Sequence, residues 1–194
     1  MDKFTEIKEE ILRRAKNAEA CVGQYKRALE SQTLQELAQV IKDNFTWCCN
    51  WKVLDVEIIE KYKTEFASVE IYANESISTG YVVIDGEVEM LSGSAVAYMW
   101  GNSTVAEMWG NSTVAEMYGN ATVTNMYGNA TVTNMCDNST VTKMWDNSTV
   151  TEMWDNAYIS TYNYIECKIS GNAIMRVRSE NKIYTNTTVE KPKL

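Results

Sequence analysis

Acidic residues that recur at fixed spacings are the first residues in this sequence that could carry chemistry. Asp137, Asp146 and Asp155 follow one another at intervals of nine residues, and Glu116 and Glu152 share a second repeated position. Rows of carboxylates attract a basic patch on another protein, and salt weakens that attraction by screening. We therefore predict that these five residues contact a partner. Asp137 and Asp155 are also expected to lie side by side, as a pair that favours a cation or a basic partner.

Tryptophans form the second group of candidates. Trp145 and Trp154 directly precede two of the aspartates, whereas Trp47 and Trp51 lie in the sequence TWCCNW. Exposed aromatic rings bury a large area on binding, so all four are candidate partner contacts. For Trp47 and Trp51 the favoured role is packing at a junction between helices, and partner binding is the alternative.

The sequence contains no recognisable catalytic or metal-binding constellation. It has no histidine, which removes the usual general base and the commonest metal ligand. Cys48 and Cys49 are adjacent and lack the CxxC spacing of a zinc site. We therefore predict a protein that is not an enzyme, that uses no cofactor or metal, and that acts by stoichiometric binding.

Composition narrows the class of partner. A formal net charge of −8 argues against a sequence-independent hold on nucleic acid, which needs clustered Lys and Arg. The five cysteines are odd in number and scattered, as is typical of reduced thiols in a cytosol. The charged start, MDKFTEIKEEILRRAK, lacks the apolar segment of a signal peptide, and no run reaches transmembrane length. We expect a cytoplasmic protein that binds neither a membrane nor nucleic acid directly.

The acidic candidates all belong to an internal repeat. From Met99 onwards a nine-residue unit occurs seven times, as MWGNSTVAE, MWGNSTVAE, MYGNATVTN, MYGNATVTN, MCDNSTVTK, MWDNSTVTE and MWDNAYIST. A short fixed period is the signature of a solenoid, in which each unit packs only against its neighbours. The elements that position the candidates are therefore the strands and turns of a β-solenoid.

Two units must form each coil, because nine residues cannot enclose a core. A coil of about 18 residues suits a two-sided β-roll or a three-sided β-helix, and one strand and one turn per unit favour the two-sided form. Alternation along the strand places Ser103 and Val105 inside and Thr104 outside. The turn asparagines are predicted to form a hydrogen-bonded ladder between coils.

Residues two repeat units apart are then stacked into columns. The predicted columns at the two edges are Trp100, Tyr118, Cys136 and Trp154, and Trp109, Tyr127 and Trp145. The methionine that precedes each of these residues is expected to accompany it at the coil edge, where ring and thioether bury each other.

The whole chain is predicted to have an α+β fold, with a helical domain followed by the solenoid. Apolar residues at helical spacing predict helices over 3–20, 22–29 and 55–66, and Thr33 with Glu36 forms a capping box for another helix that includes Phe45. The predicted parts are a helical domain and N-terminal cap at 1–66, connecting strands at 67–89, the β-solenoid at 90–186 and a polar tail at 187–194. Three isoleucines are predicted to continue the core after one shortened coil, at Ile165, Ile174 and Ile183.

Other binding functions are alternatives to protein recognition. The TVT sequences resemble the threonine arrays of ice-binding β-helices, and the aromatic columns could stack on sugar rings. A surface module that binds ice or glycan is therefore the rival interpretation. The calcium-binding RTX pattern GGxGxDxUx is not matched, and the lack of histidine disfavours a hexapeptide-repeat acyltransferase. Sheet edges at the C-terminal end of the solenoid could also form a homodimer.

The repeat resembles a known group of sequences. The units GNSTV and GNATV at 101–132, the closing AYISTYNYIECKISGNAIMRV and the stretches ACVGQYKRAL and DNFTWCCNWKV are similar to uncharacterised proteins of phages and gut bacteria. Those proteins carry WGNATV or YGNATV repeats behind a short helical region. The resemblance implies a phage or mobile-element protein in a bacterial cytoplasm. In that setting its partner would be a host protein, and the protein would inhibit a defence enzyme such as a CRISPR effector nuclease.

Overall fold

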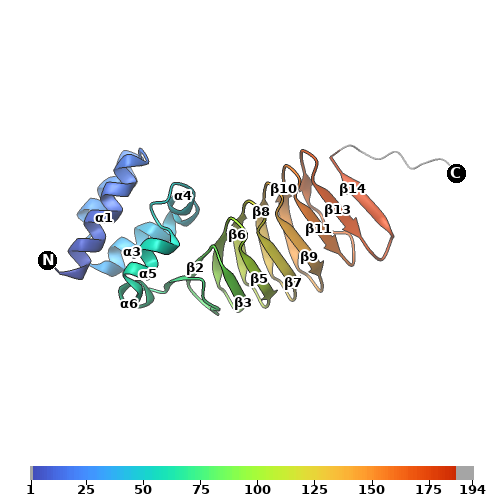
Figure 1. Cartoon of the computed structure of the whole chain (residues 1–194), viewed down its shortest axis with the longest axis horizontal. Helices are drawn as coiled ribbons and strands as arrows, with labels where there is room; N and C mark the ends of the chain where they lie inside the picture. The colour runs from blue at the N-terminus through green and yellow to red at the C-terminus, as the bar shows by residue number, and fades with distance from the viewer. Residues whose placement is uncertain (1, 187–194) are drawn as a thin grey trace. The chain divides into compact units, whose positions relative to one another are not determined.

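The chain forms two compact units, Met1–Ala73 and Asn74–Leu194. The computed structural model describes residues 2–186, so the predicted tail at 187–194 lies outside the described residues. The first unit is helical, and the second is a parallel β-solenoid in which two repeat units make up each coil (Figure 1). The predicted fold class is therefore confirmed.

The described part of the first unit contains six helices. They are α1 (Lys3–Asn17), α2 (Val22–Glu30), α3 (Leu34–Asp43), α4 (Phe45–Asn50), α5 (Val56–Lys61) and α6 (Lys63–Ala67). The predicted cap of α3 is present, because Thr33 accepts a hydrogen bond from the backbone N–H of Glu36. The unit ends with the short strand β1 (Ile71–Ala73).

Two predictions for the helical unit are wrong. The helix expected over 55–66 is broken at Tyr62, whose backbone (φ −123°) leaves the helical region between α5 and α6. Trp47 lies within the helix α4. Trp51 follows the end of that helix with 59% of its surface exposed, so it does not pack the helix junction. Trp47 is half-buried.

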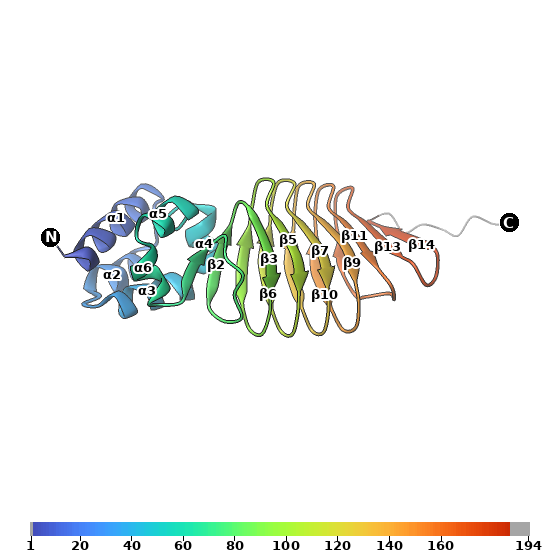
Figure 2. The same cartoon turned by 60° about the horizontal axis from the view of Figure 1, so that its bottom comes forward.

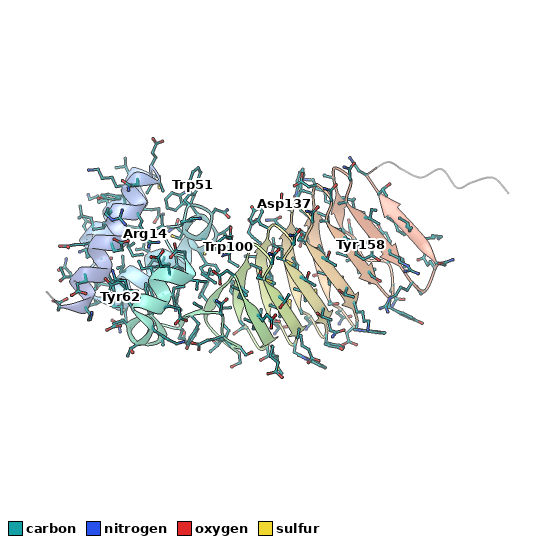
Figure 3. The ribbon with its side chains drawn as sticks, viewed as in Figure 1. Arg14, Trp51, Tyr62, Trp100, Asp137 and Tyr158 are labelled. Carbon is teal, nitrogen blue, oxygen red and sulfur yellow. The ribbon has the colours of Figure 1, made fainter. Side chains whose placement is uncertain are left out.

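Arg14 of α1, which is labelled in Figure 3, ties this helix to α5. Its Nη1 donates to Asp55 Oδ2 at 2.7 Å, and its Nε donates to Glu10 Oε1 at 2.8 Å. Asp55 also caps α5, because its Oδ1 accepts from the backbone N–H of Ile58 at 3.0 Å. One arginine thus joins the first helix to the start of the fifth.

The second unit winds through short strands that alternate between two sheets. Within this unit, one sheet has the order β2 (Tyr81–Ile84), β4 (Val96–Met99), β6 (Thr113–Met117), β8 (Thr131–Met135), β10 (Thr149–Met153) and β12 (Lys168–Ile169). The other has the order β14 (Lys182–Thr185), β13 (Ile174–Val177), β11 (Tyr158–Thr161), β9 (Thr140–Met144), β7 (Thr122–Met126), β5 (Thr104–Met108) and β3 (Glu87–Leu91). Figure 2 shows the successive coils side by side.

The strand register confirms the two-sided coil of two repeat units. Val105 pairs with Val123, its counterpart two units later on the next coil, and both are completely buried. Ser103 is buried in the small inward position before the valine, and Thr104 lies on the outer face. Inward and outward rows therefore follow the predicted alternation as far as the valine.

The methionine rows differ from the prediction. Met108 and Met126 are completely buried in the core, rather than paired with the aromatic rings at the edge. The reason is a break in alternation: Ala106 and Glu107 both lie toward the outside, and the next residue turns inward. Each sheet therefore contributes two large core rows, one of valine and one of methionine.

The asparagine ladder is confirmed at both edges. Asn120 Nδ2 donates to Asn102 Oδ1 at 2.9 Å, and Asn129 Nδ2 donates to Asn111 Oδ1 at 3.1 Å. Asn172 extends the ladder although it comes only 16 residues after its acceptor. The predicted shortened coil is therefore present.

The ends of the solenoid differ from the sequence prediction. Parallel pairing already joins Ile77 to Leu91 and Tyr81 to Val96, so the boundary predicted at residue 90 is too late. At the other end, Ile174 and Ile183 are 36% and 58% exposed and do not continue the core row. Counted from the ladder residue Asn172, Ile174 occupies the outward threonine position, and Met175 occupies the buried valine position. The last strand, β14, pairs antiparallel with β13 and so leaves the solenoid pattern.

Candidate protein-binding site at the acidic notch

Two columns of turn residues form the edges of the solenoid. The first edge follows the even-numbered strands and carries Trp100, Tyr118, Cys136 and Trp154. The second edge follows the odd-numbered strands and carries Trp109, Tyr127, Trp145 and Tyr162. On the second edge the rings of Trp109 and Tyr127 stack with centroids 4.1 Å apart. Figure 3 labels Trp100 and Asp137, which both belong to the first edge.

The first edge has a hollow where its column contains a cysteine. Cys136 is much smaller than the rings on either side of it, and a space of about 400 Å³ opens there. We call this space the acidic notch, and it is lined by Glu116, Tyr118, Asn134, Cys136, Trp154 and Asp155. The notch is thus a gap in an aromatic column, bordered by two carboxylates.

Hydrogen bonds hold the carboxylates of the notch in place. Glu116 Oε1 accepts from Asn134 Nδ2 at 3.2 Å, along the outer face of one sheet. Asp155 Oδ2 accepts from the backbone N–H of Asp137 at 3.2 Å. Asp137 in turn accepts from the backbone N–H of Gly119 at 2.9 Å. The predicted neighbours Asp137 and Asp155 are therefore linked through a backbone N–H, which offsets their mutual repulsion.

The electrostatic environment of the notch favours a cation. Burial, together with Glu116, Asp155 and Asp137, raises the pKa of Cys136 to about 11. The pKa of Tyr118 is also raised, by burial and then by its hydrogen bond to Glu116. Both groups are neutral at physiological pH, so Cys136 is not a nucleophilic thiolate. The charged side chains that line the notch, Glu116 and Asp155, are negative.

A lysine of the chain itself lies next to the notch. Lys168 Nζ is 4.7 Å from the centroid of the Trp154 ring and 3.3 Å from Glu152 Oε2. This pairs a cation with a ring and a carboxylate on the same edge. Glu152 is therefore occupied by an internal ion pair, outside the set of residues that line the notch.

The structure separates the candidates that the sequence grouped together. Glu116, Trp154 and Asp155 meet at the notch, and Asp137 contacts Asp155 through its backbone. The other acidic and aromatic candidates lie elsewhere: Asp146 and Trp145 on the second edge, Trp47 and Trp51 in the helical unit. Sequence reasoning missed the importance of Cys136, although its signal was visible as the one small residue in an aromatic column.

The second edge carries a different hollow, which we call the aromatic cleft. It has a volume of about 680 Å³ and lies between the turn at 145–149 and the loop at 161–165. Trp145, Tyr162 and Tyr164 supply rings, and Asn147 and Asn163 supply amides. The rings of Trp145 and Tyr162 are nearly parallel, with an interplanar angle of 20° and centroids 6.0 Å apart.

Within residues 2–186, no cluster of three or more His, Cys, Asp or Glu side chains has a geometry that could hold a metal ion. None of the helices in this range is long and apolar enough to cross a membrane. Comparisons with family models, with curated proteins and with solved structures found no significant match to the chain.

Proposed function

We propose that this protein is a non-enzymatic binding module, and that its acidic notch receives a basic side chain of another protein. The observation that carries the proposal is the composition of the notch. Carboxylates of Glu116 and Asp155 stand beside the ring of Trp154, at a gap in the column where Cys136 leaves space. A guanidinium or ammonium group placed there would gain both charge pairing and a ring contact.

Arginine suits this notch better than lysine. Its planar guanidinium stacks on aromatic rings and donates several hydrogen bonds at once, whereas lysine presents a point charge. Lys168, which places an ammonium group beside Trp154 and Glu152 on the same edge, supports this proposal. The partner surface should therefore be basic and contain a protruding arginine.

The resemblance to phage and gut-bacterial repeat proteins supports a more specific form of the proposal. In that form the partner is a host defence enzyme, such as a CRISPR effector nuclease with its basic surface. Inhibition would then be stoichiometric, because the chain has no histidine and its notch thiol is protonated.

The sharpest test fills the notch without changing its charges. Cys136→Trp places in the gap the residue that the same column already holds at Trp100 and Trp154. The matched control is Tyr127→Trp, which enlarges a ring on the opposite edge. We expect Cys136→Trp to weaken binding to a captured partner by roughly tenfold or more, and the control to leave it unchanged. Equal binding by both variants would overturn the proposal.

A second test removes charge. Glu116→Gln with Asp155→Asn keeps the shape of the notch, and Asp146→Asn alters an equivalent turn position on the second edge. The double variant should bind more weakly and show less dependence on salt, whereas Asp146→Asn should match the wild type. Enzyme inhibition that persists at a small fraction of one equivalent would contradict stoichiometric action.

The aromatic cleft favours glycan binding as a second candidate function. Rings with nearby amides are the groups that stack on and hydrogen-bond to sugars, and Trp145 and Tyr164 are 37% and 52% exposed. A glycan array would test this candidate with Trp145→Ala as the variant and Trp109→Ala as the control. Binding lost only in Trp145→Ala would support it, and no glycan bound would exclude it. No comparable observation favours ice binding, since threonine hydroxyls such as that of Thr131 bond to their own coil or its neighbour.

A further inference from the structure

The helical unit contains a cavity that the proposed function does not use. Its volume is about 240 Å³, and side chains of α1, α2, α3 and α4 line it. We propose that this cavity binds a small, neutral and mainly apolar molecule of about ten non-hydrogen atoms, since a cavity of about 150 Å³ is known to hold benzene. A bicyclic aromatic compound has this size.

The space comes from small side chains at core positions. Ala15 of α1 and Ala28 of α2 are 7% and 5% exposed and both line the cavity. A leucine at either position would extend into the space between the helices. The cavity opens partly to solvent, because the exposed Cys21 is among the residues that line it. Ala15 and Ala28 thus leave space between the helices that larger side chains would occupy.

The lining specifies a neutral ligand. It contains no Lys, Arg, Asp or Glu, and its apolar walls include Ile41 and the ring of Trp47. Cys48 also lines the cavity, and burial raises the pKa of its thiol to about 12, so the thiol stays uncharged. A charged ligand would lose its hydration against walls that carry no charged side chain.

Two side-chain amides offer one polar anchor. Asn44 Nδ2 donates to the backbone carbonyl of Val40 at 2.8 Å and to Gln24 Oε1 at 3.3 Å. Gln24 Oε1 also accepts from Arg27 Nη1 at 2.9 Å. These bonds occupy Asn44 Nδ2 and Gln24 Oε1, and both amides line the cavity, where the other end of each can bond to a ligand. An apolar molecule with a single polar group, such as the N–H of an indole ring, matches this arrangement.

The test uses the full chain, labelled with ¹⁵N, and indole as the probe. We expect saturable one-to-one binding, with amide shifts confined to residues around the cavity such as Ala28, Ile41 and Trp47. The anion indole-3-acetate keeps the ring and adds a charge, and it should bind at least about tenfold more weakly. Shifts centred on the solenoid edges, or equal binding of the two probes, would overturn the proposal.

A matched pair of variants completes the test. Ala28→Leu should reduce indole affinity by at least about tenfold because it occupies the space. Ala67→Leu makes the same change at an exposed position on α6 and should leave affinity within about twofold of the wild type. Should Ala28→Leu fail to fold, Ala15→Val applies a smaller increase to another wall. Unaltered affinity in a folded cavity variant, or no saturable binding of indole to the wild type, would show that the cavity is only a packing defect.

Discussion

One backbone position in each repeat unit is left-handed, and the chain places either glycine or aspartate there. Gly101 has φ +70°, and Asp137 has φ +55°. An aspartate tolerates this conformation less well than glycine, but Asp137 and Asp146 each accept a hydrogen bond from a backbone N–H of the preceding coil. These carboxylates therefore stabilise the turn as well as giving the edges their negative charge.

Two substitutions of Asp137 separate the effect of its hydrogen bond from the effect of the left-handed backbone. Asp137→Ala should lower the free energy of unfolding by about 1–2 kcal/mol, because alanine keeps the strain of the left-handed backbone and loses the hydrogen bond to Gly119. Asp137→Gly loses the same hydrogen bond but relieves the strain, so its loss should be smaller. Urea unfolding of both variants measures the difference. An Asp137→Ala variant as stable as Asp137→Gly would show that the left-handed backbone causes no strain at this position.

The inward and outward rows make a second prediction at the residue scale. Val123 is completely buried, and Thr122 beside it lies on the outer face. Val123→Asp puts an unpaired charge into the core and should cost on the order of 4 kcal/mol or more. Thr122→Asp should cost about 1 kcal/mol or less. Denaturant unfolding measures both, and equal losses would contradict the register.

At the scale of elements, the helical unit depends on a charged link and the solenoid on ladders. Glu10 accepts hydrogen bonds from Arg13 and Arg14, which lower its pKa from 4.5 to about 2. Arg14 extends the link to Asp55 at the start of α5. In the solenoid, by contrast, asparagines bond to their copies on the next coil without any charge. Low pH should therefore destabilise the helical unit by protonating Glu10, whereas the asparagine ladder has no charge to lose.

The link predicts a specific pH dependence. A carboxyl group whose pKa is lower in the folded state stabilises that state fully above its unfolded pKa, here 4.5, and loses this contribution as pH falls toward about 2. Glu10→Gln should therefore lower the free energy of unfolding by about 1 kcal/mol at neutral pH and match the wild type near pH 2. Glu9→Gln, at an exposed neighbouring carboxylate, is the control. A loss at Glu10 that is constant across this range would exclude the ion pair as its cause.

At the scale of the whole molecule, the solenoid is modular. Each strand of the nine-residue repeat pairs with the strand two elements away, as β5 does with β7, and the partner lies two repeat units along the chain. The natural unit of insertion or deletion is therefore the coil and not the single repeat. Coils can be removed without changing which sheet a later strand joins.

Deletions of two lengths test this modularity. Removing two repeat units, from Met108 to Asn125, should leave a folded protein with one coil fewer. Removing a single unit moves every later strand to the opposite sheet, so the outward-facing charges and shortened C-terminal coil no longer match their neighbours. The midpoint of thermal unfolding, followed by circular dichroism, compares the two. A single-unit deletion as stable as the longer one would contradict the two-unit coil.

The sequence by itself determined the solenoid, its coil length, the buried valine row and the asparagine ladder. These features follow from a short period and from strand alternation, so each is repeated many times and depends only on neighbouring coils. The division into a helical and a β part was equally local, because the apolar period changes after Phe66. Trp51 shows the limit of such reasoning, since an aromatic residue predicted to be packed is 59% exposed.

Only the tertiary structure decided where the repeat pattern gives way. Alternation breaks before each methionine as the chain turns the corner, which moves Met108 and its copies into the core. The two residues missing from the last coil shift the register, so that Met175 rather than Ile174 is inside. The tertiary structure also divided the candidate site residues between two edges and the helical unit. The notch at Cys136 likewise depends on which side chains meet across coils. Spacing along the chain predicts a row, but the volumes of neighbouring side chains in three dimensions decide where that row has a gap.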